Sequence, residues 1–250
     1  MARVVAVIPA RYASQRLPAK PLIDLLGKSM IQRVYEQASK ASLLSQVVVA
    51  TDDDRIAAAV RAFGGEVIMT SDTIRSGSDR VAAIAGVLPA DIFVNVQGDE
   101  PLIAPQMIDE AVRVVLDDPD ADVGTLVRKL DSPADLHNPA VVKVVLSAGR
   151  SALYFSRSVV PFIREEADQS LWLNHHMFYR HVGIYVFRRS FLLKYPSLSE
   201  SALERAERLE QLRILEHGYR IKVGITQFDC ISVDTQDDVR RVIEVLKSRS

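Results

Sequence analysis

Short apolar runs that alternate with segments of helical period constrain this fold more than any other feature. Each run is almost continuously apolar, as in strands that are buried on both faces of a sheet. The runs span residues 4–8, 47–50, 66–69 and 92–96. Between two of them, Ile56, Ala59, Val60 and Phe63 recur with the spacing of one helix face. This alternation predicts an α/β fold with a doubly wound, mostly parallel sheet and helices on both faces.

The middle of the chain has a different pattern. It contains strand-like runs at 123–130, 141–146, 153–156 and 182–187, with few helical patterns between them. A polar stretch from Arg164 to Asn174 is expected to be a loop. We therefore expect a single domain over residues 1–250, with a β-rich lobe inserted at about 123–200.

Composition excludes several functional classes. The chain has 31 Lys plus Arg and 32 Asp plus Glu, a net charge of −1, which argues against a nucleic-acid or membrane-surface binder. No apolar run approaches the roughly 18 residues that span a bilayer, and Pro9 interrupts the N-terminal run, so no signal peptide is expected. Cys230 is the single cysteine and cannot form an intrachain disulfide. A cytoplasmic protein is expected.

The residues after each strand are where a doubly wound sheet binds its ligands. The first strand is followed by PARYASQRLPAKPL, which contains Arg11, Arg16 and Lys20 on a proline-rich loop. Three cations can hold a polyphosphate without a glycine cradle, and no Walker loop or GxGxxG fingerprint is present. A solvated loop whose charges pair with nearby acids is the alternative interpretation.

Two acidic residues follow later strands. Asp99 lies in VNVQGDEP, where a carboxylate can reach a metal held by a phosphate, although the same residues also favour a turn. Asp234 lies in VDTQDD, where Asp234 or Thr235 is a good helix cap. An aspartate at that point can also supply a second metal carboxylate.

Other polar residues allow a structural and a functional interpretation alike. In SGSDR, the lack of a side chain at Gly77 would let a flat ring approach, but a plain helix start fits equally well. A lone histidine such as His181 is usually structural. In LEQLR, we expect Leu209, Leu212 and Leu215 to pack inward, with Glu210 and Gln211 on other faces. No zinc-ligand spacing or GxSxG elbow is present.

The motifs become specific in combination. In chain order they are VIPARYASQRLPAKPL, VNVQGDEP, ALYFSR, RHVGIY, LEQLR and VDTQDD. Together they closely resemble the 3-deoxy-manno-octulosonate (Kdo) cytidylyltransferases, the CMP-Kdo synthetases, over essentially the whole chain. The resemblance implies a fold of the nucleotide-diphospho-sugar transferase type. It also implies a magnesium-dependent reaction of CTP with Kdo for lipopolysaccharide biosynthesis, and a homodimer to which the β-rich region contributes.

The resemblance also implies roles for individual residues. Arg11, Arg16 and Lys20 would hold the triphosphate, and Asp99 and Asp234 would ligate Mg²⁺; these five would carry catalysis, without a histidine base. The implied nucleotide-binding residues are Pro9, Ala10, Ser76, Gly77 and Gln97. The implied sugar-binding residues are Arg157, His181, Tyr185, Glu210 and Gln211.

This sequence departs from the usual family pattern at two motifs. SGSDR stands where SGTER is usual, which places Asp79 in the position of a longer glutamate, and LPAKPL stands where LPGKPL is usual. Ala19 is expected to require ordinary backbone angles and to reshape the loop slightly. The alternatives are the same reaction on 8-amino-Kdo or sialic acid, and a CTP-binding protein without turnover. A dehydrogenase is disfavoured by the missing glycine fingerprint.

Overall fold

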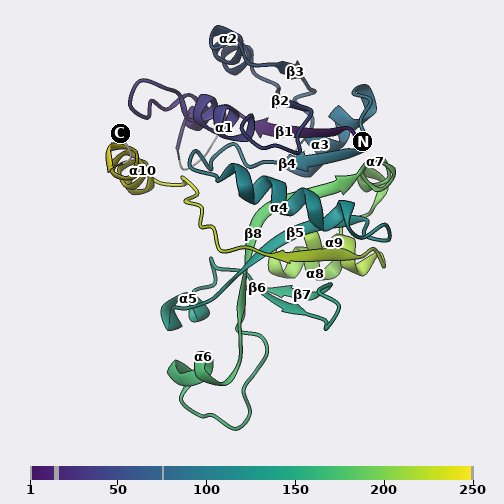
Figure 1. Ribbon diagram of the computed structural model, residues 1–250, viewed down its shortest axis with the longest axis vertical. Coiled ribbons are helices and arrows are strands. Elements are labelled where there is room, and N and C mark those ends of the chain that lie inside the picture. Colours follow the sequence, from purple (N-terminus) through teal and green to yellow (C-terminus); the bar gives the residue numbers. More distant parts are fainter. Residues whose placement is uncertain (1, 14–16, 75, 249–250) are drawn as a thin grey trace. The chain divides into compact units, whose positions relative to one another are not determined.

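The computed structural model describes residues 2–13, 17–74 and 76–248, and its ribbon is shown in Figure 1. Arg16 lies outside the described residues. The chain forms two compact units, which are described separately below. Unit 1 comprises residues 1–109, 186–196 and 229–250, and unit 2 comprises residues 110–185 and 197–228. Unit 2 thus begins before residue 123, where we expected the β-rich lobe to start, and extends beyond residue 200.

Unit 1 contains a parallel sheet with strand order β3-β2-β1-β4. The strands are β1 (Val4–Ala10), β2 (Gln46–Thr51), β3 (Val67–Met69) and β4 (Ile92–Asn95). Ala6 of β1 is in register with Val47 and Val94 of its two neighbours. The predicted α/β fold with a mostly parallel sheet is confirmed. The prediction that all four strands are buried on both faces is wrong for β3, because this strand lies at the edge of the sheet and Met69 is 43% exposed.

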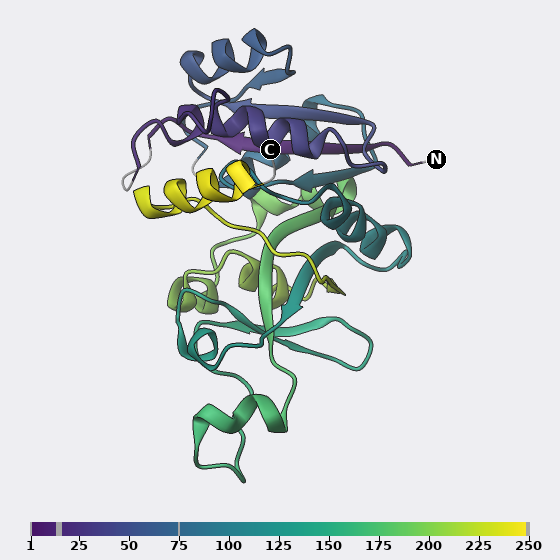
Figure 2. The ribbon, with the colours of Figure 1, turned by 60° about the vertical axis from the view of Figure 1, so that its left-hand side comes forward.

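Three helices of unit 1 begin at side-chain caps. Ser29 caps α1 (Met30–Ala38), Asp53 caps α2 (Asp54–Ala62) and Ser76 caps α3 (Gly77–Val87). The remaining helical elements assigned wholly or partly to unit 1 are η1 (Lys20–Leu22), α4 (Pro105–Leu116), α7 (Arg189–Leu192), η3 (Tyr195–Ser197) and α10 (Gln236–Ser248). Figure 2 shows α10 beside α1, where Val239 and Val242 share a buried cluster with Met30.

Unit 2 is built around β5 (Val123–Lys129), which lies between β8 (Tyr179–Arg188) and β9 (Ile221–Ile225). Strand β5 is parallel to β9, which the sequence analysis did not predict. β6 (Lys143–Leu146) is antiparallel to both β7 (Ala152–Ser156) and β8. The last three residues of β8 belong to unit 1. The helices of unit 2 include α5 (Pro133–His137), α8 (Ala202–Glu207) and α9 (Gln211–Glu216).

The stretch from 164 to 174 is not the plain polar loop that we expected. It contains η2 (Gln169–Leu171) and the start of α6 (Trp172–His175). Trp172 is 2% exposed, packs in a cluster with Leu136 and Phe178, and donates from its indole nitrogen to the carbonyl of Glu166 at 2.8 Å. One buried aromatic residue therefore anchors a segment whose composition is mostly polar.

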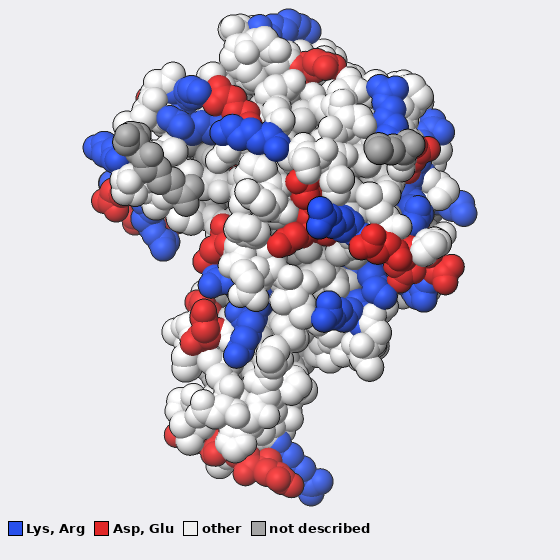
Figure 3. Space-filling model, in the orientation of Figure 1, with Lys and Arg blue, Asp and Glu red and all other residues white. Residues whose placement is uncertain are grey.

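Surface charge is mixed on the face drawn in Figure 3, where Lys and Arg side chains are interspersed with Asp and Glu. Among the described residues, no helix is both long enough and apolar enough to cross a membrane.

Candidate active site

A cavity of about 370 Å³ opens at the C-terminal ends of β1 and β4, and every residue that lines it belongs to unit 1. Its lining includes most of the residues expected to bind nucleotide and metal. They are Pro9, Ala10, Arg11, Lys20, Gly77, Gln97, Asp99 and Asp234; Ala13, Pro21 and Gly98 complete the lining and were not singled out from the sequence. The rule that ligands bind beyond the strand ends is the signal that places these residues together.

Lys20 lies between the two carboxylates of this cavity. Its Nζ donates to Asp99 Oδ2 at 2.6 Å and to Asp234 Oδ1 at 3.0 Å, and the Lys20 side chain is 13% exposed. Burial alone would lower the pKa of Lys20, but the charges and hydrogen bonds of the two aspartates outweigh burial and raise it. The ammonium group is therefore protonated at neutral pH, and two carboxylates converge on one cation.

The backbone brings the two aspartates together. The amide of Val233 donates to the carbonyl of Asp99 at 2.9 Å, which ties the segment before α10 to the loop after β4. Thr235 fills the capping position of α10: its hydroxyl accepts from the amide of Asp238 at 3.3 Å, and Asp238 accepts from the amide of Thr235 at 2.9 Å. Of the two capping candidates, Thr235 is thus the cap, and the carboxylate of Asp234 contacts Lys20.

The loop after β1 is held from both sides. The guanidinium of Arg11 donates to the carbonyl of Ile74, and the guanidinium of Arg55 lies 3.2 Å from the ring centre of Tyr12. Ala19 has φ 55° and ψ 26°, which is the left-handed region. The expectation that Ala19 requires ordinary angles is therefore wrong: Ala19 adopts a conformation that suits glycine, at a cost of about 1–2 kcal/mol for an L-residue.

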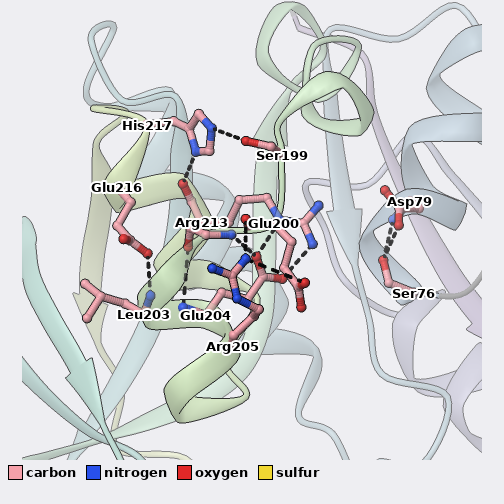
Figure 4. A network of polar contacts seen from close by, with 11 residues as sticks. Ser76, Asp79, Ser199, Glu200, Leu203, Glu204, Arg205, Arg213, Glu216 and His217 are labelled. Carbon is pink, nitrogen blue, oxygen red and sulfur yellow. Dashed lines mark hydrogen bonds and ion pairs between the residues drawn. The ribbon is translucent and has the colours of Figure 1, made fainter.

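The start of α3 meets the strand ends closely. Ser76 accepts from the amide of Asp79 at 3.0 Å and donates to its carboxylate at 2.8 Å (Figure 4), so the shorter acid of SGSDR completes the helix cap. A Cβ at Gly98 would lie 2.8 Å from the carbonyl oxygen of Pro9, so only glycine fits there. Asn95, which sequence analysis missed, is 3% exposed, and its Oδ1 has no hydrogen-bond partner among the described residues.

Arg157 of unit 2 binds backbone carbonyls with most of its guanidinium. Nε donates to Glu207 at 2.7 Å, Nη1 to Pro139 at 3.0 Å and Nη2 to Arg208 at 3.4 Å. A guanidinium carries five N–H donors, so two remain for a ligand. Arg157 thus holds the turn after α8 and keeps a limited capacity to bind an anion.

Lys143, which the sequence analysis did not single out, holds the backbone of Arg157 by a hydrogen bond. It is fully buried, and its ammonium donates to three carbonyls, those of Asn138, Val141 and Arg157, at 3.0, 2.7 and 2.7 Å. Burial lowers the pKa of Lys143. All three of its donors are used, so this lysine is a structural cross-link between β6 and the end of β7.

His181 and Tyr185 lie together on β8. Their ring centres are 5.2 Å apart, and the rings of His181 and Phe155 pack edge-to-face with their centres 5.2 Å apart. Nε2 of His181 is 2.9 Å from the hydroxyl of Thr125, and burial lowers the pKa of His181 to about 3. The imidazole is therefore neutral at physiological pH.

The remaining predicted sugar-binding residues begin α9. Glu210 is exposed, whereas Gln211 is 5% exposed and packs inward, so the expectation that both lie on outer faces is wrong for Gln211. Leu215 is only partly buried, and Ile214 fills the core in its place. Arg213, also in α9, donates to both carboxylate oxygens of Glu204 in α8, at 2.6 and 2.7 Å (Figure 4).

Comparisons with known proteins agree with this arrangement. A family model described as cytidylyltransferase matches residues 5–222. The 3-deoxy-manno-octulosonate cytidylyltransferase of Geotalea uraniireducens is 51% identical over 98% of this chain and 99% of its own. The Bacteroides thetaiotaomicron enzyme of the same name is 49% identical over 99% and 100%. A solved structure of CMP:2-keto-3-deoxy-manno-octonic acid synthetase complexed with CTP is 41% identical, covers both chains fully and has a TM-score of 0.93.

Proposed function

The chain belongs to the 3-deoxy-manno-octulosonate cytidylyltransferase family, and on that premise we propose that it transfers CMP from CTP to the anomeric hydroxyl of Kdo. The observation that carries the proposal is the cavity of unit 1, in which Arg11 and Lys20 meet the carboxylates of Asp99 and Asp234. Cations and paired carboxylates at the end of a parallel sheet suit a triphosphate and the metal that accompanies it.

Mg²⁺ is the metal that this donor set fits. Asp99 and Asp234 already converge on one cationic group, the ammonium of Lys20. Among the described residues, no group of three or more His, Cys, Asp or Glu could hold a metal, so other ligands would come from phosphate and water. Proteins usually bind Mg²⁺ through one or two carboxylates, together with substrate phosphates and water. When bound, the ion would neutralise charge on the phosphates and stabilise the leaving pyrophosphate.

In the proposed reaction, the anomeric oxygen of Kdo forms a bond to the α-phosphorus, and the bond from that phosphorus to the bridging oxygen breaks. The electron pair leaves with pyrophosphate, and the hydroxyl proton passes to solvent. The cations at Arg11 and Lys20 would hold phosphate oxygens and offset their charge, so catalysis would rest on positioning and electrostatics. Gly77 and Gln97 line the same cavity and would contact the nucleoside.

We propose that the sugar is bound by residues of unit 2. Arg157 retains two N–H donors, which suit the carboxylate of Kdo, and His181 is neutral and suits a hydroxyl. Tyr185 shares a ring contact with His181, and Glu210 and Gln211 begin α9. These groups supply hydrogen bonds for the hydroxyls of an acidic sugar.

A homodimer formed through unit 2 is a further part of the proposal. Three large apolar side chains are exposed between β7 and β8: Phe162 at 71%, Met177 at 49% and Leu171 at 42%. These three side chains belong to one segment of the chain, and exposed apolar patches mark interaction surfaces. We also place the enzyme in the cytoplasm, because its single cysteine cannot form an intrachain disulfide.

The test is magnesium-dependent release of pyrophosphate from CTP, with Kdo, 8-amino-Kdo and sialic acid offered separately. Release with Kdo is the expected result. Release mainly with 8-amino-Kdo or sialic acid would overturn the sugar assignment and keep the transfer chemistry. No release with any of the three, despite CTP binding, would overturn the catalytic proposal.

A further inference from the structure

Thr125 on β5 is a fully buried hydroxyl group beside a residue of the proposed sugar site. Its Oγ1 lies 2.9 Å from Nε2 of His181, 2.7 Å from the carbonyl oxygen of Ile184 and 3.3 Å from that of Val182. All of these groups belong to unit 2. The hydroxyl therefore meets one nitrogen that can donate or accept and two oxygens that can only accept.

The single proton of this hydroxyl decides the protonation of the imidazole. A carbonyl accepts but never donates, so a contact of 2.7 Å between Oγ1 and the Ile184 oxygen requires the hydroxyl proton to lie between them. Oγ1 must then accept from His181, and Nε2 must carry a hydrogen. In the opposite arrangement the hydroxyl would donate to Nε2, and its oxygen would face two carbonyl oxygens with no proton between them.

The ring of His181 is also fixed in orientation. The imidazole packs edge-to-face with the ring of Phe155 and contacts the ring of Tyr185, and the backbone amide of His181 donates to the carbonyl of Val142 at 2.8 Å. Burial lowers the pKa of His181 to about 3, so no second proton is taken up near neutrality. With Nε2 protonated and the ring neutral, Nδ1 carries a lone pair, and it makes no hydrogen bond within the described part of the chain.

We infer that Thr125 is a positioning residue that holds His181 as the neutral Nε2–H tautomer, so that Nδ1 accepts a hydrogen bond from a hydroxyl of the acidic sugar. This inference rests on the proposed function for the identity of the ligand. A lone pair at Nδ1 repels a carboxylate and attracts a hydroxyl proton. His181 therefore orients the sugar: its hydroxyl face is directed to β8, and its carboxylate is left for a cation such as Arg157.

The tautomer is measured directly by two-bond ¹H–¹⁵N correlation spectra of the imidazoles at pH 7, with His181→Gln used to assign the signal among the five histidines. We expect a protonated Nε2 and an unprotonated Nδ1 in the wild type. Thr125→Val keeps the shape but removes the acceptor, so the signal should move toward a mixture of tautomers. Thr125→Ser keeps the hydroxyl and should restore the wild-type signal. Protonated Nδ1 in the wild type, or an unchanged spectrum in Thr125→Val, would overturn the inference.

Kinetics separate the two parts of the argument. Thr125→Val should raise KM for Kdo roughly two- to tenfold, the value of one neutral hydrogen bond, and leave KM for CTP unchanged. Thr125→Ser should return KM for Kdo to the wild-type value. If His181→Gln leaves KM for Kdo unchanged, the proposed sugar site fails at this residue. If His181→Gln raises KM while Thr125→Val leaves it unchanged, the sugar site stands and the role of Thr125 is refuted.

Discussion

Replacing Arg213 by methionine should strongly destabilise unit 2, because it leaves a buried carboxylate without its cation. Arg213 donates through Nε and Nη2 to the two oxygens of Glu204, at 2.7 and 2.6 Å. The Arg213 side chain is 15% exposed and that of Glu204 only 7%. Glu204 also accepts from the amide of Ser201 at 3.2 Å, which completes the cap of α8. The pair therefore joins α8, which contains Glu204, to α9, which begins at Gln211 and contains Arg213.

The expected loss follows from this geometry. Removing one partner of a buried ion pair typically costs about 3–5 kcal/mol of unfolding free energy, because the other charge stays desolvated. With a urea dependence of about 2–3 kcal/mol per M, the midpoint should fall by about 1–2.5 M. The double variant Glu204→Gln/Arg213→Met removes both charges, so its loss should be clearly smaller than the sum of the two single losses.

Urea unfolding followed by tryptophan fluorescence is a suitable assay, because Trp172 is the single tryptophan and lies buried in the same unit. Arg205→Met is the matched control. Arg205 lies in α8, 4.0 Å from Glu200, with both side chains more than half exposed (Figure 4). Its loss should stay below about 0.5–1 kcal/mol. If Arg213→Met costs no more than Arg205→Met, the reasoning from burial is refuted.

Four other predictions test the site and the surface. Asp99→Asn and Asp234→Asn should each lower pyrophosphate release at least about a hundredfold while the variant stays folded; near-wild-type turnover would exclude that residue as a metal ligand. Ala19→Gly should raise stability by up to about 1 kcal/mol, because relief of the left-handed strain outweighs the entropy of glycine; calorimetry would show a higher Tm, and a lower Tm would contradict the argument. The unfolded imidazole of His181 takes up a proton near pH 6.5 and the folded one only near pH 3, so its contribution to stability is complete above pH 6.5 and is lost as the pH falls toward 3. The unfolding free energy of His181→Gln should therefore fall less than that of the wild type between pH 7 and 4, and equal slopes would refute this. Phe162→Asp should convert a dimer to a monomer in light scattering, whereas a monomeric wild type would refute the dimer.

The parallel sheet could be predicted because its signal is local. A strand buried on both faces must be apolar at nearly every position, and β1, β2 and β4 all meet that condition. The pattern fails where burial is partial. β3 lies at the sheet edge, and β9 alternates apolar residues with Lys222 and Gly224, so neither has a continuous apolar face on both sides. Pairing partners depend on contacts that are distant in sequence, such as β5 with β9, and composition does not encode them.

The site could be predicted in part for a related reason. Strand ends of a parallel sheet meet at one edge, so Pro9 and Asp99 had to lie near each other. The contacts of Lys20 could not be foreseen, because its partners are 79 and 214 positions away. The left-handed backbone conformation of Ala19 could not be predicted either, because alanine, unlike glycine, does not indicate a positive φ. The helical turns around Trp172 were missed as well, because the segment is mostly polar and a single buried apolar residue orders it.

Donor counting separates the cations that can bind a ligand from those that only hold the fold. Lys143 gives all three N–H groups to backbone carbonyls, so it has none for a substrate, and its burial disfavours the charge that a ligand would need. Lys20 gives two donors to carboxylates and keeps a third, and its pKa is raised. Arg157 donates three of its five guanidinium N–H groups to carbonyls and keeps two for a ligand. By this criterion Lys20 and Arg157 can each bind an anionic group while they stay anchored, which is what a preorganised site requires. Lys20 is anchored by the side chains of Asp99 and Asp234, and Arg157 by the carbonyls of Glu207, Pro139 and Arg208. The proposed binding of anionic groups therefore depends on residues that need not touch those groups.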